Sequence, residues 1–503
     1  MATRFYEVAA GQHTPQHKPN ARHERDSEAH KILRQYAGNQ HAQNKNEQQG
    51  EESLPGVRAP GATGVIYCTD RAIANGFSYE NQEWANLGQG APEVNALPGD
   101  PPRPTVLDFT KYGDFVHEYA PTVGVKELRQ AVANLYNHQY RQGRTSQYTY
   151  ENVCIVPGGR AGMSRVAAVI GDVYCGYQIP EYTTYSEVLS VFKRLVPIPS
   201  HLPAEDKYKL DINKLKSDIK NMSLSVVVMS NPRNPTGQVI QGQDLKDVVD
   251  LGKTGTTIIL DEFYSWYMYW DDKEKIGKSI SGAEYVDDVN ADSVILIDGM
   301  TKGPRLPGWR VCWVVGPKSL ISAVSQSGSF LDGGANHPLQ MAAIPQLEPS
   351  RVLQSKIALQ NHFKAKRDYV LQRLDDMGLP VHCPPQATFY IWLDLSGLAA
   401  PLDSALVFFE ELLREKTIVV PGVSGISPPA TVINPSHRRN LFDSPCHHFV
   451  RISFGPPLET LKRGLDSIER LLDKHRRASH HIGHSYRGSV SYDFPGVNHN
   501  THI

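Results

Sequence analysis

The chain has 503 residues, of which 40% are hydrophobic and 21% are charged, and its formal net charge is −1. This length is more than one hydrophobic core supports, so we expect a soluble globular protein of at least two domains. The chain has 52 basic and 53 acidic residues. This balance excludes the excess of positive charge with which proteins bind nucleic acid or an anionic membrane. The expected partners are therefore small molecules or further copies of the chain.

The six cysteines are scattered and form no CxxC pair. This pattern predicts reduced thiols, with neither a disulfide scaffold nor a metal site. No apolar run reaches the ~18 residues that span a bilayer, and the N-terminus lacks the pattern of a secretory signal. We expect a cytoplasmic protein.

In chain order, residues 1–58 come first and are rich in Gln, Asn, His, Glu and Lys. Such a segment buries too little apolar surface to offset its ordering entropy, so we expect a disordered arm. Apolar runs of strand length then alternate with helical patterns such as 160–170 and 244–251. Continuous Val/Ile runs of this kind predict a mostly parallel sheet covered on both faces. The runs are 152–156, 225–230, 256–260, 294–297 and 309–315.

The last third has a different pattern. Helices are predicted at 351–377, 404–416 and 458–475, with strands at 388–393 and 449–454. This arrangement indicates a smaller α+β domain beside the large one. Residues 478–503 are polar and His-rich, and we expect a second disordered tail.

Polar motifs follow three of the strands, where open α/β sheets bind their ligands, and a fourth motif puts an arginine inside an apolar strand. Each motif alone is a weak signal, since a lysine or aspartate after a strand is usually a loop charge or a helix cap. The motifs are Asn-Pro-Arg-Asn-Pro-Thr-Gly with Asn234, Asp-Glu-Phe-Tyr with Asp261 and Tyr264, Thr-Lys-Gly-Pro-Arg-Leu-Pro-Gly-Trp-Arg with Lys302 and Arg310, and Val-Arg-Ile-Ser-Phe with Arg451.

Taken together, these motifs resemble the class I/II family of fold-type I pyridoxal 5′-phosphate (PLP) aminotransferases, over roughly residues 85–475. The resemblance implies an α/β fold with a mostly parallel, seven-stranded type of sheet in a large domain and a smaller α+β domain. The implied large PLP-binding domain is 119–335, and the small domain combines 59–118 with 336–477. The implied reaction moves an amino group between an α-amino acid and an α-keto acid.

The family's catalytic residues carry over onto matching positions. Lys302 matches the lysine that holds PLP as a Schiff base and then moves the proton between the substrate Cα and the cofactor. Asp261 matches the carboxylate that keeps the pyridine nitrogen protonated, so that the ring withdraws electrons. Asn234 and Tyr264 match the pair that hydrogen-bonds the ring's phenolic oxygen.

The phosphate site is implied by a glycine-containing turn that opens a helix, where backbone N–H groups and the helix dipole hold an anion. Its residues are Gly159, Arg160 and Ala161, and Arg310 matches the arginine that pairs with the phosphate. Tyr182 matches the aromatic ring stacked on the cofactor. Tyr119 resembles the tyrosine that reaches the phosphate from a neighbouring subunit, which implies a homodimer.

Arg451 matches the arginine that binds the substrate α-carboxylate, with Gly90 and Asn234 beside it. The sequence departs from the family at Gly299, where many members have a hydroxyl residue. It departs again at Arg160, where the turn often has Ser or Thr. We consider two readings of Arg160: a charge-assisted donor that replaces the missing hydroxyls, or a solvent-facing residue that leaves the phosphate more weakly held.

Two rival functions stay open at this point. The same lysine, aspartate and arginine serve other PLP reactions on this fold, namely those of lyases, cyclases, decarboxylases and carbon–carbon bond-forming enzymes. A regulator that keeps the fold without catalysis is the other rival. The polar first 58 residues do not suit the winged helix of such regulators.

Overall fold

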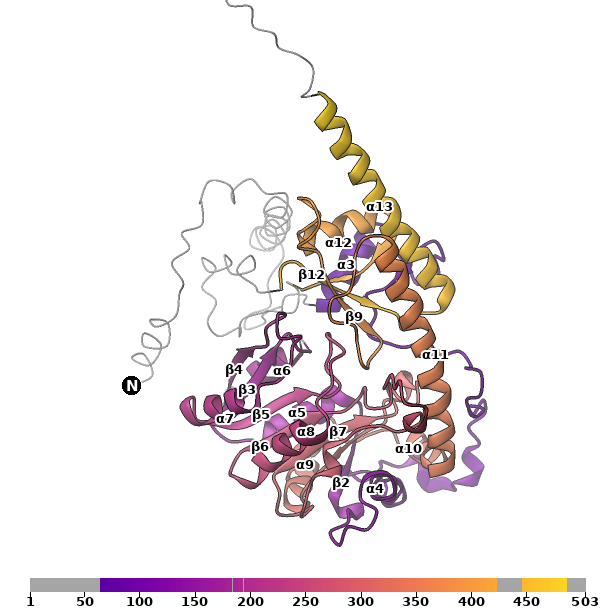
Figure 1. The fold of residues 1–503 in the computed structure, drawn as a ribbon. Helices are drawn as coiled ribbons and strands as arrows, with labels where there is room; N and C mark the ends of the chain where they lie inside the picture. Colours follow the sequence, from indigo (N-terminus) through magenta and orange to yellow (C-terminus); the bar gives the residue numbers. More distant parts are fainter. Residues whose placement is uncertain (1–63, 183, 193, 423–445, 486–503) are drawn as a thin grey trace, which may run out of the picture.

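The computed structural model describes residues 64–182, 184–192, 194–422 and 446–485 (Figure 1). Within these residues the strands of the central sheet run in the order β2-β8-β7-β6-β5-β3-β4. Their bounds are β2 Val153–Val156, β3 Val173–Ile179, β4 Leu195–His201, β5 Leu224–Ser230, β6 Thr257–Asp261, β7 Val294–Gly299 and β8 Cys312–Val315.

The central sheet is mostly parallel, as its apolar runs predict. Strands β3 to β7 pair in parallel, whereas β8 is antiparallel to both β2 and β7. Every residue of β7 is buried, and so is almost all of β5, because helices cover both faces of the sheet. Strands β3 and β4 are not evident in the sequence, since Gly176, Pro197 and Pro199 interrupt their apolar runs.

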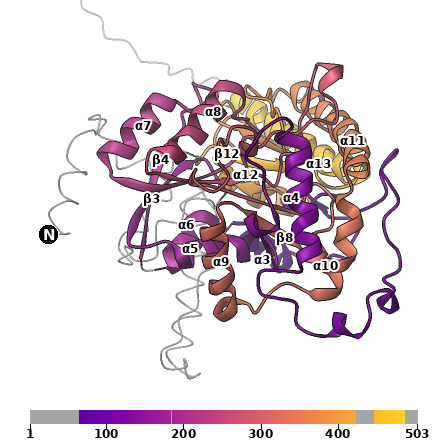
Figure 2. The ribbon, with the colours of Figure 1, turned by 90° about the horizontal axis from the view of Figure 1, so that it is seen from below.

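Helices α7 and α8 lie on one face of this sheet, and α5, α6 and α9 lie on the other (Figure 2). Each helix presents an apolar stripe to the sheet and a polar face to solvent. The bounds of the large-domain helices are α4 Lys126–Tyr140, α5 Gly159–Val169, α6 Thr184–Val191, α7 Ile212–Asn221, α8 Gly242–Asp250, α9 Lys318–Leu331 and α10 His337–Ala343.

A second, smaller body contains an antiparallel sheet of order β11-β12-β9. A separate parallel pair, β1 with β10, brings residues 85–86 beside 417–418, so the two ends of the chain build this body together. Its elements are α3 Gly64–Ala74, β1 Ala85–Asn86, β9 Tyr390–Asp394, α12 Ala405–Arg414, β10 Thr417–Ile418, β11 Val420–Pro421, β12 Phe449–Ser453 and α13 Leu458–Ser485.

Helix α11, Pro349–Asp376, runs from the large body to the small one (Figure 1). It has 28 residues, so it is about 42 Å long at 1.5 Å per residue. Glu348 caps its start by accepting hydrogen bonds from two backbone N–H groups, and Pro349 occupies the first helical position, which suits proline.

Two boundaries differ from the sequence-based expectation. The strand expected at 309–315 begins only at Cys312, because Pro307–Trp309 form a 3₁₀ turn and Arg310 adopts left-handed backbone angles. The helix expected to end at 475 continues to Ser485, since the residues directly after position 475 include neither proline nor glycine. The arm 1–58 and residues 486–503 lie outside the described part of the chain.

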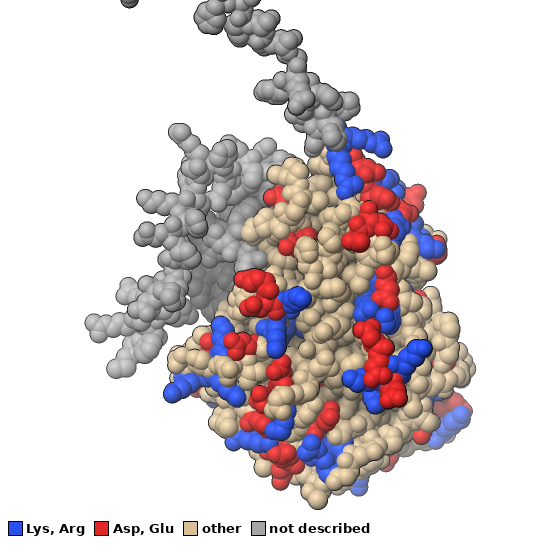
Figure 3. All heavy atoms as spheres, in the orientation of Figure 1, with Lys and Arg blue, Asp and Glu red and all other residues tan. Residues whose placement is uncertain are grey.

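The surface mixes basic and acidic side chains on the face drawn in Figure 3, without a large area of one sign. Among the described residues, no helix is both long and apolar enough to cross a membrane.

Candidate active site

Three of the predicted site residues stand at the carboxyl ends of neighbouring strands. Asp261 ends β6, Asn234 follows β5, and Lys302 follows β7. Because β5, β6 and β7 are adjacent in the sheet, these side chains meet at one edge, the usual ligand position in such folds. Arg451 reaches the same place from β12 of the small body, so the site lies between the two bodies.

The amine of Lys302 is held inside the site. Its Nζ donates to the carbonyl oxygen of Gly90 and lies 5.9 Å from the centre of the Tyr264 ring. Burial lowers the pKa of Lys302 to about 8, and the nearby charge of Arg451 acts in the same direction, while Asp261 opposes it. A much larger fraction of this amine is therefore neutral near pH 8 than for an ordinary lysine, as a nucleophile requires.

Asp261 accepts a hydrogen bond from the hydroxyl of Tyr185 at 2.9 Å. Burial raises the pKa of its carboxyl to about 6, although the Tyr185 hydrogen bond and the charge of Lys302 both act to lower it. No described residue forms an ion pair with Asp261. The carboxylate is thus available to a cation bound at the sheet edge, such as a protonated ring nitrogen. Sequence reasoning missed Tyr185, although it lies three residues after Tyr182.

Asn234 and Arg451 are in direct contact. Arg451 Nη1 donates to Asn234 Oδ1 at 3.2 Å, and Nη2 donates to the Gly88 carbonyl at 2.9 Å. A guanidinium only donates, so the Asn234 oxygen must face it and the amide NH₂ points elsewhere, free of any hydrogen bond to described residues. The Arg451 guanidinium also stacks 4.3 Å from the centre of the Tyr390 ring, and its buried Nε has no partner among the described residues. These features suit a carboxylate ligand.

The hydroxyl of Tyr264 hydrogen-bonds that of Tyr390 at 2.9 Å. Both tyrosines are buried, and burial raises the pKa of Tyr264 well above its usual value. No hydrogen bond links Tyr264 to Asn234. Tyr390 was absent from our sequence-based set, although the strand predicted at 388–393 contains it.

The predicted phosphate turn is packed against Arg310. A Cβ on Gly158 would lie 1.8 Å from Arg310 Nη2, and a Cβ on Gly159 would lie 2.5 Å from the Phe263 ring. At position 158 glycine is favoured by its φ of +111°, since the Arg310 side chain could move aside, and at position 159 by the buried Phe263 ring. Arg310 donates to the carbonyls of Pro307 at 3.2 Å and Pro157 at 3.5 Å.

Neither Arg310 nor Arg160 forms an ion pair with a described carboxylate, and both are exposed. Arg160 and the half-buried Ala161 belong to the first turn of α5, whose backbone N–H groups are open to a ligand. Two unpaired guanidiniums near a helix N-terminus make an anion site.

The departure at Gly299 has a steric cause. A Cβ there would lie 2.5 Å from Cys312 Sγ and 2.6 Å from Cys312 Cα on the neighbouring strand. The family's usual hydroxyl residue has no room at this position. The nearby hydroxyl of Thr301 instead hydrogen-bonds Cys312 Sγ at 3.2 Å.

The two remaining aromatic residues differ in position. Tyr182 packs edge-on against Tyr185, with ring centres 5.7 Å apart, so it lies beside the partner of Asp261. Tyr119 is 97% exposed and forms no hydrogen bond with the described residues. The fold thus brings together every predicted site residue except Tyr119.

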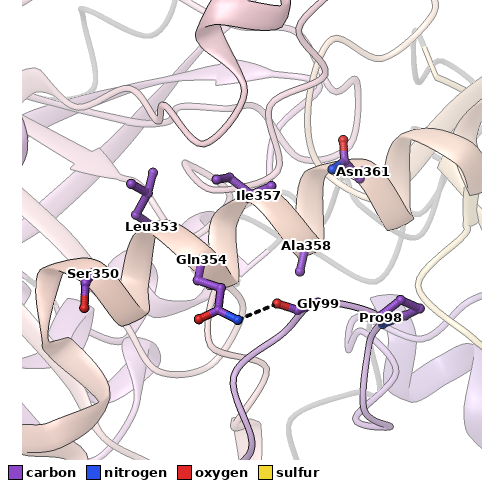
Figure 4. Close-up of a pocket in the computed structure, with 8 residues that line it drawn as sticks. All are labelled: Pro98, Gly99, Ser350, Leu353, Gln354, Ile357, Ala358 and Asn361. Atoms are coloured by element: carbon purple, nitrogen blue, oxygen red, sulfur yellow. Dashed lines mark hydrogen bonds between the residues drawn. The ribbon is translucent and has the colours of Figure 1, made fainter.

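A surface cavity of about 330 Å³ contains none of the predicted residues (Figure 4). It lies between α11 and a loop whose Gly99 carbonyl accepts a hydrogen bond from Gln354 at 3.0 Å. Its lining is Pro98, Gly99, Ser350, Leu353, Gln354, Ile357, Ala358 and Asn361.

The site as a whole fits PLP. Its anion turn matches the phosphate, the Asp261 carboxylate matches a protonated pyridine nitrogen, and the amine of Lys302 matches the aldehyde. The free NH₂ of Asn234 is a donor for the phenolic oxygen.

Comparisons with known proteins agree with this fit. Residues 83–468 match the family model "Aminotransferase class I and II". The chain is 25% identical over 362 residues to a "Probable aspartate/prephenate aminotransferase" of Aquifex aeolicus, covering 71% of this chain and 84% of that protein. It is also 25% identical over 365 residues to an aspartate aminotransferase of Pyrococcus abyssi, covering 70% and 84%.

A solved structure of a Thermus thermophilus aspartate aminotransferase mutant complexed with tryptophan shares the fold, with a TM-score of 0.67 and 20% identity over 83% of this chain and all of that one. The family match spans most of the chain. The chain belongs to the class I and II aminotransferases and is a PLP-dependent transaminase.

Proposed function

We propose that this transaminase works through Lys302, Asp261 and Tyr264, with Lys302 holding PLP covalently through its side-chain amine. The observation that carries the proposal is the half-buried Lys302 side chain, whose amine has a pKa lowered to about 8 and donates to the Gly90 carbonyl at the same strand edge as Asp261. When bound, PLP supplies the electron-withdrawing ring that makes the substrate Cα–H acidic.

Each remaining site residue has a proposed part in holding the cofactor. Gly159, Arg160, Ala161 and Arg310 bind the phosphate through backbone N–H groups and guanidiniums. Asp261 pairs with the ring nitrogen. Asn234 and Tyr264 donate to the phenolic oxygen, and Tyr182 stacks on the ring.

Lys302 also carries the proton in this proposal. Its neutral amine would accept and hold the proton from the substrate Cα, a role worth roughly 10²–10⁴-fold in rate. The Gly90 carbonyl, which accepts from Lys302 Nζ, keeps the amine within the site. The rings of Tyr264 and Phe389, 5.9 and 5.8 Å from the nitrogen, limit access of water.

The proposed substrate is an α-amino acid whose carboxylate binds Arg451, beside Gly90 and Asn234. Support comes from the Arg451 guanidinium, which is fixed by Asn234 Oδ1, Gly88 O and the Tyr390 ring and has a buried, unpartnered Nε. The names of similar proteins include aspartate, prephenate and aromatic amino acid aminotransferases. A substrate screen should therefore contain both acidic and aromatic amino acids.

We further propose a homodimer in which Tyr119 reaches the phosphate site of the neighbouring subunit. The segment 94–119 runs along the outside of the molecule (Figure 2). It exposes apolar side chains that burial in an interface would remove from water, among them Val106, Phe109 and Phe115. If Tyr119 acts in this way, a Tyr119→Phe variant stays dimeric by light scattering but binds PLP more weakly.

A cytoplasmic location and the domain division 119–335 against 59–118 plus 336–477 also belong to this proposal. Five of the six cysteines are buried, and Cys68, Cys154, Cys175, Cys312 and Cys383 are free thiols, which suits a reducing compartment. The pairing of β1 with β10 supports the assignment of residues 59–118 to the small domain.

The decisive experiment is an absorbance spectrum of the purified protein before and after single amino acids are added without a keto acid. Transamination replaces the visible band of bound PLP by a near-ultraviolet band and releases one keto acid per site. A visible band that persists, or one that gives other products, would instead indicate a lyase, cyclase or decarboxylase.

A further inference from the structure

Glu181 is a buried carboxylate whose two oxygens accept four hydrogen bonds. Oε1 accepts from the backbone N–H of Tyr182 at 2.9 Å and from the hydroxyl of Ser230. Oε2 accepts from the backbone N–H of Ser230 at 3.1 Å and from Arg233 Nη1 at 2.9 Å. A carboxylate offers about four acceptor positions, so Glu181 is fully used.

These contacts connect two loops that carry proposed cofactor residues. Ser230 ends β5, and its hydroxyl oxygen accepts from the backbone N–H of Asn234 at 3.1 Å. A serine hydroxyl has one proton, so Ser230 must donate that proton to Glu181. Tyr182 and Asn234 are thus both tied to the same carboxylate, Tyr182 directly and Asn234 through one hydroxyl.

Arg233 balances the charge of this carboxylate. The ion pair measures 2.9 Å, and both side chains are 2% exposed. Burial raises the pKa of Glu181 to about 6, while Arg233 and Ser230 act to lower it. A buried charge without a partner is costly, so the pair has to be kept or lost together. Neither side chain forms a hydrogen bond or ion pair with Lys302, Asp261 or Arg451.

We propose that Glu181, with Arg233 as its counter-ion, is a positioning residue that sets Tyr182 and Asn234 against the cofactor. The inference rests on the proposed roles of these two residues. Four donors converge on this one side chain, whereas simple charge burial would require only Arg233. The carboxylate therefore accepts hydrogen bonds from both loops.

The test is Glu181→Gln, which keeps the shape but turns one acceptor oxygen into an NH₂ group facing two donors. The readouts are the dissociation constant of PLP, the pH titration of the bound cofactor's absorbance, and the thermal unfolding of the PLP-free protein. A weakened Asn234 donor leaves more electron density on the phenolic oxygen, which raises the pKa of the covalently linked nitrogen. We expect that pKa to rise by about one unit, a tenfold gain in proton affinity.

Ser230→Ala is the second variant, because it removes the hydroxyl that links Glu181 to Asn234 and leaves the ion pair with Arg233 intact. It should raise the same pKa with little loss of thermal stability, and it decides the question if Glu181→Gln does not fold. Asp332→Asn is the matched control. It removes the carboxylate partner of another buried arginine, Arg165, without contacting a proposed cofactor residue. It should lower stability and leave the titration unchanged.

The double variant Glu181→Gln/Arg233→Gln removes both charges of the ion pair as well as the acceptor oxygen. It therefore separates the effect of an unpaired charge from the effect of the lost acceptor. It should recover stability relative to Glu181→Gln but keep the altered titration. If Glu181→Gln and Ser230→Ala lose stability but titrate like the wild type, the positioning role is wrong and the pair is only structural. If the wild-type protein itself has no titrating cofactor band, the proposed function fails instead.

Discussion

At the ring end of the site, Asp261, Tyr264 and Asn234 each have a hydrogen-bond partner within the protein. At the phosphate end, Arg160 and Arg310 are exposed and have no carboxylate partner among the described residues. The ring end is thus fixed before the ligand arrives, whereas the phosphate end gains its charge partner from the ligand. Under the proposed assignments, the first region serves the chemistry and the second serves the affinity for PLP.

The largest effect should come from Lys302→Ala, which removes the reacting amine from the fixed region. We expect a loss of at least ~10⁴-fold in kcat, the upper range for a positioned acid/base group. Borohydride reduction followed by mass spectrometry should find PLP attached to the wild-type protein and absent from the variant. Lys364→Ala, at a half-exposed lysine of α11, is the control and should retain the adduct. An adduct that survives in the Lys302 variant would mean that another lysine binds PLP.

Asp261→Asn should be next, with a loss of about 10²–10³-fold in kcat, as for removal of one fixed electrostatic partner. PLP affinity should change less, because the phosphate end is intact. Steady-state kinetics and PLP titration together separate the two quantities. Equal losses in both would contradict the division between a chemical end and an affinity end.

Arg310→Ala should have the opposite effect to Asp261→Asn, with a larger change in PLP affinity than in kcat. Charge-assisted hydrogen bonds contribute roughly 1.5–3 kcal/mol, so we expect PLP affinity to fall by about 10–150-fold while kcat at saturating PLP stays close to normal. Arg160→Ala should have a smaller effect in the same direction. An unchanged PLP affinity in Arg160→Ala would favour the solvent-facing reading of that residue. Raising the salt concentration should weaken PLP binding of the wild type, since exposed charges are screened.

The smallest expected effect is on how the rate of covalent PLP uptake depends on pH. Burial and Arg451 lower the pKa of Lys302 to about 8, and only the neutral amine reacts. The rate of covalent PLP uptake by the PLP-free protein should rise about tenfold per pH unit below pH 8 and level off above it. Arg451→Gln removes a cation that lowers this pKa, so its plateau should begin at higher pH. A flat profile for the wild type would argue against the depressed pKa.

The sequence predicted where the motif residues lie relative to the strands, because a buried apolar run followed by a polar residue indicates both the strand and its carboxyl end. Asp261 at the end of β6 and Asn234 after β5 are of this kind. The sequence could not predict Tyr185, Tyr390 or Glu181, since their roles depend on which strand lies beside which. It also gave no reason for Gly299, whose cause is a thiol thirteen residues later on a neighbouring antiparallel strand.

Strands β3 and β4 were missed for a related reason. Their glycine and prolines break the apolar pattern, yet pairing with β5 stabilises β3 as a strand. The turn before β8 was missed because Arg310 takes left-handed backbone angles that are uncommon for a residue with a Cβ. That conformation places the guanidinium of Arg310 over Gly158.

The contact between Arg451 and the Gly88 carbonyl joins residues 363 positions apart in the chain. A ribosome adding ~5–20 residues per second needs about 20–70 s to travel that distance. The strands that carry Asn234, Asp261 and Lys302 emerge long before β12 does. During synthesis the strand ends proposed to hold the cofactor can therefore assemble early, and the contact between Arg451 and Gly88, beside the proposed carboxylate site, forms last.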